Sequence, residues 1–115
     1  MSVRWPAEWE PHEATWITWP WDAEVWGDAH AAAVDAMAEA AAALTHGEHV
    51  ILSVPDQASG AAATRAIARA GGKPKRIVVQ EIPSDDVWVR DHGPTVVVDA
   101  ATGARKAVDW NFNAW

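Results

Sequence analysis

The sequence contains no cysteine, and this absence excludes several kinds of site. Without a thiol the chain can form no disulfide, no thiolate metal site and no cysteine nucleophile of its own. Basic residues are also scarce, with 9 Lys and Arg against 16 Asp and Glu, so the formal net charge is −7. Affinity for nucleic acid depends on cations placed at phosphates. The acidic composition therefore argues against a nucleic-acid partner.

Long apolar runs are missing as well. No run approaches the roughly 20 residues that a helix needs to cross a bilayer. Charges interrupt the first residues, where a signal peptide would need an apolar stretch. We therefore expect no contact with a membrane and a cytoplasmic location for the protein. The length of 115 residues suits one small domain.

Alanine and tryptophan are the abundant apolar residues. The chain has nine tryptophans, six of which lie within residues 5–26. Because other large apolar side chains are few, we expect these indoles mainly in the core. The alternative is that the N-terminal tryptophans line a sugar-binding or cation-binding surface.

Predicted strands alternate with Ala-rich helices along the chain. Apolar runs predict strands at 14–19, 49–54, 76–82, 95–99 and 105–112, and helical patterns occupy 28–46 and 58–70. Asp28 is the expected N-cap of the first helix, and Gly47 its expected C′ residue. This alternation predicts an α/β fold with a terminal β-hairpin.

The polar loop 85–94 concentrates charged and titratable groups between two predicted strands. Its carboxylates could bind a divalent cation, perform acid–base chemistry, or clamp a flat cation together with Trp88. Alternatively, the loop is held by salt bridges between Arg90 and its aspartates. An extended backbone would place Trp88 and Asp91 on opposite faces. A bend would therefore be needed to aim both side chains at one ligand.

A second cluster, His46-Gly47-Glu48-His49, contains residue types that can bind metals. It lacks the helical register in which paired histidines bind zinc. We therefore expect no metal site there.

Three segments resemble the agmatine deiminase and bacterial-type peptidylarginine deiminase family. They are W-P-A-E-W-E-P-H-E-A-T-W-I-T-W-P at 5–20, D-D-V-W-V-R-D-H-G-P-T at 85–95 and D-W-N-F-N-A-W at 109–115. The resemblance implies an α/β propeller of five ββαβ modules. Residues 1–115 would form about one and a half of those modules, as the N-terminal part of a single domain.

The resemblance also implies an activity. Members of the family hydrolyse agmatine to N-carbamoylputrescine and ammonia, through a cysteine nucleophile and a histidine that activates water. By motif match, Trp88 and Asp91 bind the cationic guanidine substrate, and Asp91 also takes part in catalysis. Asp86 and Arg90 also match the motif, but the resemblance defines no role for them. Our interpretation is that these two residues orient the loop. No cofactor is implied.

The segments that would supply the cysteine and the histidine are not in this sequence. We therefore expect an N-terminal fragment that is inactive alone, from a full-length protein that could form a homo-oligomer. One alternative is a peptidylarginine deiminase-like enzyme acting on another guanidine. The other is a non-catalytic remnant that binds guanidines or amines.

Overall fold

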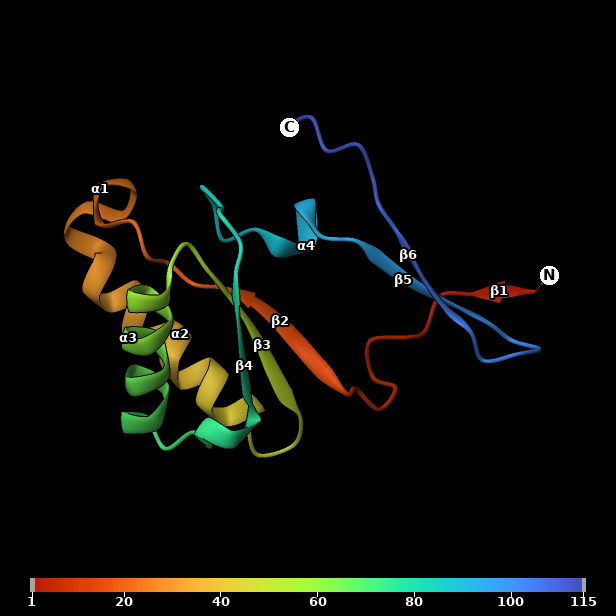
Figure 1. Ribbon diagram of the computed structural model, residues 1–115, viewed down its shortest axis with the longest axis horizontal. Helices are drawn as coiled ribbons and strands as arrows, with labels where there is room; N and C mark the ends of the chain where they lie inside the picture. The colour runs from red at the N-terminus through yellow and green to blue at the C-terminus, as the bar shows by residue number, and fades with distance from the viewer. Residues whose placement is uncertain (1, 115) are drawn as a thin grey trace. The chain divides into compact units, whose positions relative to one another are not determined.

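The computed structural model describes residues 2–114, which divide into two compact units (Figure 1). One unit comprises His12–Val87, and the other combines residues 2–11 with residues 88–114. Each unit contains a three-stranded sheet. The predicted mixed α/β class is therefore confirmed.

The sheet of the unit His12–Val87 is parallel, in the order β2 (Ala14–Thr18), β3 (His49–Val54) and β4 (Ile77–Glu81). Helix α2 (His30–Leu44) connects β2 to β3, and α3 (Gln57–Arg69) connects β3 to β4 through the short turn η2 (Pro74–Arg76). Both helices lie on the same side of the sheet (Figure 1).

The core of this unit lies between the sheet and the two helices. Ile17, Leu52 and Val79 occupy matching positions on adjacent strands, so their side chains share the face toward the helices. Leu52 and Ile67 are fully buried. Alanines dominate the helical side and allow close packing. The other core residues are Trp19, which follows β2, the β3 residues Val50 and Val54, and the helical alanines Ala38, Ala41, Ala42, Ala63 and Ala66.

The first helical region is interrupted, and the prediction of one helix starting at Asp28 is wrong. It begins with α1 (Ala23–Trp26), continues through the 3-10 turn η1 (Gly27–Ala29), and only then enters α2. The cap is Asp22, whose Oδ1 accepts the Glu24 N–H at 2.9 Å. Gly27 ends α1 with φ +52°, which interrupts the regular helix.

The helix ends are also explained by local chemistry. Helix α2 ends at Leu44, and the Thr45 hydroxyl donates to the Ala42 carbonyl at 2.6 Å. Gly47 does not adopt a positive φ, so its prediction as the C′ residue is wrong. Helix α3 starts at Asp56, which accepts the Ser59 N–H at 2.7 Å. That hydrogen bond lowers the pKa of the Asp56 carboxyl.

The second unit holds an antiparallel sheet in the order β1 (Val3–Arg4), β5 (Thr95–Asp99) and β6 (Arg105–Val108). The predicted hairpin of β5 and β6 is confirmed, but β6 ends at Val108 rather than at residue 112. The predicted polar loop contains a helical turn, α4 (Val89–His92). Among residues 2–114, no helix has the length and apolar character needed to cross a bilayer.

Candidate functional site

Arg90 and Asp91 lie in the helical turn α4 and Trp88 is its N-cap, and this corrects the extended conformation considered from the sequence. The Asp91 N–H donates to the Trp88 carbonyl at 2.9 Å, and the Gly93 N–H donates to the Val89 carbonyl at 2.7 Å. The backbone at Trp88 has φ −76° and ψ 57°. The backbone is therefore turned between Trp88 and Asp91, and the alternation that would put them on opposite faces of a strand does not apply.

Both side chains of that pair are accessible. The Trp88 side chain is exposed, and so is Asp91. Within residues 2–114, no Lys, Arg or His forms an ion pair with the Asp91 carboxylate. A carboxylate and an indole are the groups that can contact a planar cation.

Arg90 does not hold the loop through its aspartates, contrary to that alternative. Its guanidinium pairs instead with the carboxylate of Glu8, in the same unit. Both side chains are largely exposed, so the ion pair adds little to stability. Its structural effect is to join the N-terminal segment to α4.

The N-terminal segment of this unit contains a second ion pair. The Arg4 guanidinium donates to both carboxylate oxygens of Glu10, at 2.8 and 2.9 Å. These hydrogen bonds, with one from the Ala7 N–H, lower the pKa of Glu10. Trp5 and Trp9 lie on either side of Ala7 and are 74% and 89% exposed. The expectation that the N-terminal tryptophans are core residues is therefore wrong for these two and for Trp16 and Trp21, which are also exposed, whereas Trp19 is buried.

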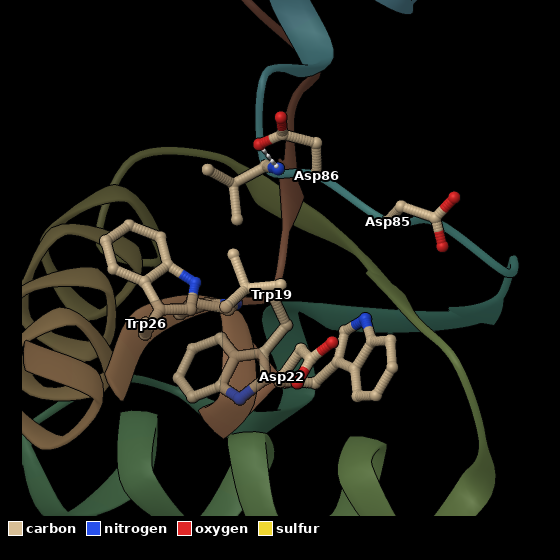
Figure 2. Close-up of a pocket in the computed structure, with 9 residues that line it drawn as sticks. Trp19, Asp22, Trp26, Asp85 and Asp86 are labelled. Atoms are coloured by element: carbon tan, nitrogen blue, oxygen red, sulfur yellow. Dashed lines mark hydrogen bonds between the residues drawn. The ribbon is translucent and has the colours of Figure 1, made fainter. Parts of the chain in front are cut away.

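Asp85 and Asp86 belong to the unit His12–Val87, where they line a small hollow (Figure 2). The Asp86 Oδ1 accepts the Val87 N–H at 2.7 Å, and the Ser84 hydroxyl donates to the Asp86 carbonyl at 2.8 Å. The Trp21 indole N–H donates to the Ser84 carbonyl at 2.9 Å. Asp86 is thus engaged with the backbone of its own loop.

The hollow combines acidic and aromatic side chains that sequence reasoning did not connect. Asp22 and Trp26 line it from the region around α1, opposite Asp85 and Asp86 (Figure 2). Its volume of about 10 Å³ is enough for about one water molecule. The only sequence feature that indicates this hollow is the high tryptophan content of residues 19–26. No local pattern indicates that this stretch meets residues 85–87.

Glu48 and His46 of the 46–49 cluster have different partners. Glu48 Oε2 accepts the Thr15 hydroxyl at 2.8 Å and lies 3.5 Å from His12 Nδ1. His46 Nε2 lies 3.1 Å from the Gly71 carbonyl oxygen. Within the described range, no three His, Cys, Asp or Glu residues form a group that could hold a metal ion.

Known proteins resemble this chain along almost its full length. The model of the Porphyromonas-type peptidyl-arginine deiminase family matches residues 4–115. The agmatine deiminase of Pseudomonas aeruginosa (strain LESB58) is 45% identical over 114 residues, which are 99% of this chain and 29% of the relative. The agmatine deiminase of Stutzerimonas stutzeri is 44% identical over 110 residues, or 96% of this chain and 28% of the relative.

Solved structures agree on the fold. A C. jejuni agmatine deiminase superposes with a TM-score of 0.80 at 20% identity, covering 98% of this chain and 32% of that chain. A substrate-bound variant of the C. jejuni enzyme gives the same TM-score at 22% identity, covering 99% and 31%. The chain spans under a third of the length of these relatives. The match across residues 4–115 shows that the chain belongs to the Porphyromonas-type peptidyl-arginine deiminase family.

Proposed function

We propose that the full-length protein hydrolyses agmatine to N-carbamoylputrescine and ammonia, a step toward putrescine. The observation that carries this proposal is the identity of 44–45% to proteins named agmatine deiminase over nearly the whole chain. The agmatine guanidinium is a planar, delocalised cation. Trp88, the N-cap of α4, and Asp91, within α4, supply an indole and a carboxylate, which have the chemistry to contact it.

In this proposal Asp91 is a catalytic and substrate-binding residue. Its carboxylate accepts N–H bonds from the guanidinium, and these charge-assisted bonds are stronger than bonds between neutral groups. The Trp88 ring contributes a cation–π contact and excludes water from the bound group. Arg90 and Asp86 orient the segment, through the ion pair with Glu8 and the hydrogen bond to the Val87 N–H.

The covalent chemistry requires residues from outside this chain. A cysteine thiolate attacks the guanidinium carbon, ammonia leaves with a proton, and an amidino-cysteine intermediate remains. Water that has given a proton to a histidine then attacks the same carbon, and the thiolate is released with N-carbamoylputrescine. No cofactor takes part. Asp91 balances the positive charge throughout, because its carboxylate stays beside the guanidinium-derived group.

The same family membership supports proposals about the whole protein. The two described units would form the first part of a five-module α/β propeller within one domain that includes residues 1–115. We place the full-length enzyme in the cytoplasm, where it could assemble as a homo-oligomer.

The test is the release of ammonia from agmatine by the full-length protein and two variants. Asp91→Asn keeps the size of the side chain but removes its charge. The loss of a charge-assisted bond should cost about 2–4 kcal/mol, roughly 30- to 1000-fold in kcat/KM. Asp35→Asn, on the exposed side of α2, is the matched control and should have parental kinetics. Equal kinetics for the two variants would show that Asp91 is outside the site.

The isolated 115-residue chain serves as the negative control in that assay. It contains no cysteine, so it cannot form the thioester-like intermediate on which the reaction depends. We expect no ammonia above background. Turnover by the mass-verified chain would contradict the proposed cysteine chemistry.

A second candidate substrate is another guanidine, because the matching family model is named for peptidyl-arginine deiminases. Parallel assays with agmatine, free arginine and an arginine-containing peptide separate these possibilities by their kcat/KM values. Agmatine should be the preferred substrate. Binding of agmatine without release of ammonia would instead support a non-catalytic guanidine-binding protein.

A further inference from the structure

The unit His12–Val87 contains a second, larger cavity beside helices α2 and α3. We call it the helix cavity, and its lining includes Trp19, Trp21, His30, Ala62, Ala66 and Arg69. Its volume is about 280 Å³, near the lower end of the range of about 300–1,000 Å³ for small-molecule sites. The small side chains of Ala62 and Ala66 on α3 leave this space open.

Hydrogen bonds hold the aromatic wall of the helix cavity in place. The Trp21 indole N–H donates to the Ser84 carbonyl at 2.9 Å, and His30 Nε2 lies 2.8 Å from the Pro20 carbonyl oxygen. The Trp19 backbone N–H donates to the Ser53 carbonyl at 3.0 Å. A ligand entering the cavity therefore meets groups that are already ordered, which lowers the entropic cost of binding.

One polar group in this wall has no acceptor among residues 2–114. Trp19 is only 4% exposed and its indole N–H donates to none of the described residues, but its nitrogen is not enclosed, since His92 Nε2 is the buried unpaired side-chain atom of the described residues. Figure 2 shows the indole nitrogen of Trp19 turned toward α3, on the side where the helix cavity lies. Because this N–H is reached by solvent and has no acceptor among the described residues, it is available to donate to a bound ligand.

The charged group of the helix cavity is a cation. Arg69, an exposed residue, lines the open rim of the cavity from the last turn of α3, and among the described residues no carboxylate lies within ion-pair distance of its guanidinium. None of the lining residues is acidic. The cavity therefore presents donors and a positive charge beside aromatic and aliphatic surfaces, in a chain whose net charge is −7.

From these observations we infer that the helix cavity binds a small organic carboxylate with a flat apolar body. The carboxylate accepts hydrogen bonds from the Arg69 guanidinium and the Trp19 indole N–H, and its body packs between the two indoles and the α3 alanines. This ligand class has the opposite charge to the guanidine substrate proposed above. Binding at the helix cavity is consequently measured without reference to agmatine turnover.

Benzoate is the probe, and benzamide is the uncharged molecule of the same shape. Calorimetry on the full-length protein should detect benzoate binding, with benzamide at least about tenfold weaker because it lacks the charge. Arg69→Gln should weaken benzoate about tenfold or more and leave the affinity for benzamide unchanged. Arg65→Gln, an exposed change on α3 outside the cavity lining, is the matched control and should bind benzoate normally.

Trp19→Phe tests the unpaired donor, since it keeps an aromatic ring and removes the N–H. It should weaken benzoate by about three- to tenfold, with circular dichroism confirming the fold. If this buried change prevents folding, the pair of arginine variants still decides the question. The inference is overturned if benzoate does not bind at about 10 mM, or if Arg65→Gln reduces its affinity as much as Arg69→Gln does.

Discussion

At the scale of single residues, the spacing of Trp88 and Asp91 determines what the motif can contact. In an extended strand these two positions point to opposite faces. In the structure Trp88 precedes the helical turn α4, and Asp91 donates its N–H to the Trp88 carbonyl at 2.9 Å. The backbone between the two residues is therefore turned, and the strand alternation does not separate them.

Replacing Trp88 in the full-length protein separates ring shape from ring electronics. A desolvated cation–π contact is worth about 1–2 kcal/mol, so Trp88→Ala should lower kcat/KM for agmatine by roughly 5- to 30-fold. Trp88→Phe keeps an aromatic face and should recover part of that loss. Steady-state ammonia release measures both effects.

Trp9→Ala is the control for this pair of variants, because Trp9 is 89% exposed and lies outside the 85–95 motif. Its kcat/KM should stay close to that of the parent protein. Trp88→Phe behaving like Trp88→Ala would mean that the ring contributes no cation–π energy. A large loss in Trp9→Ala would place the aromatic contact elsewhere.

At the scale of elements, local patterns predicted those parts of the fold that local interactions determine. The strands His49–Val54 and Thr95–Asp99 were predicted with these bounds, and the second helix differs by one residue at each end from Gln57–Arg69. Their periodicity and flanking glycine and proline residues lie within the segment itself. Burial of Trp19 likewise follows from its position at the end of an apolar strand.

The elements that were missed depend on distant contacts or on a single turn. Strand β1 is two residues long and exists through pairing with β5, far away in the sequence. Gly27 interrupts a pattern that otherwise predicts one helix, and for that reason the sequence indicates Asp28 as the cap, whereas the cap in the structure is Asp22. The 85–95 motif indicates Trp88 and Asp91, whereas the hollow that Asp22 lines together with Asp85 and Asp86 exists only in the folded chain.

Packing of α3 on the sheet supports a prediction about Gly60. A Cβ at this position would lie 2.8 Å from Cγ1 of Val79, a stiff β-branched side chain on β4. Overpacking costs about 1–3 kcal/mol, which exceeds the gain of up to about 1 kcal/mol from replacing a helical glycine by alanine. Gly60→Ala should therefore lower the Tm of the full-length protein by roughly 1–2 °C, because the large entropy of unfolding of that protein makes each kcal/mol a small shift.

The same substitution in a Val79→Ala background identifies the cause of that loss. With the Val79 methyl groups removed, Gly60→Ala should no longer lower Tm and should raise it slightly through helix propensity. Gly47→Ala is the control, because a Cβ there meets no atom within 4 Å and the backbone φ is not positive. A loss of Tm that persists in the Val79→Ala background would rule out this contact as its origin.

At the scale of the whole molecule, the described units leave large apolar side chains on their surfaces. Trp16 and Val78 share the sheet face opposite α2 and α3 and are 41% and 44% exposed. Trp5 and Trp9 are more exposed still. The relatives are more than three times longer than this chain, so in the full-length protein further segments are available to cover such surfaces.

The isolated 115-residue chain should therefore self-associate, since contiguous apolar surface promotes association in water. Sedimentation should give a weight-average mass that exceeds 12.4 kDa and rises with protein concentration. Changing both Trp16 and Val78 to lysine should lower that mass, because like charges on one sheet face repel the same face of a second copy. Arg65→Gln on the helical side should leave it unchanged. A single 12.4 kDa species at all concentrations would show that these exposed side chains do not drive association.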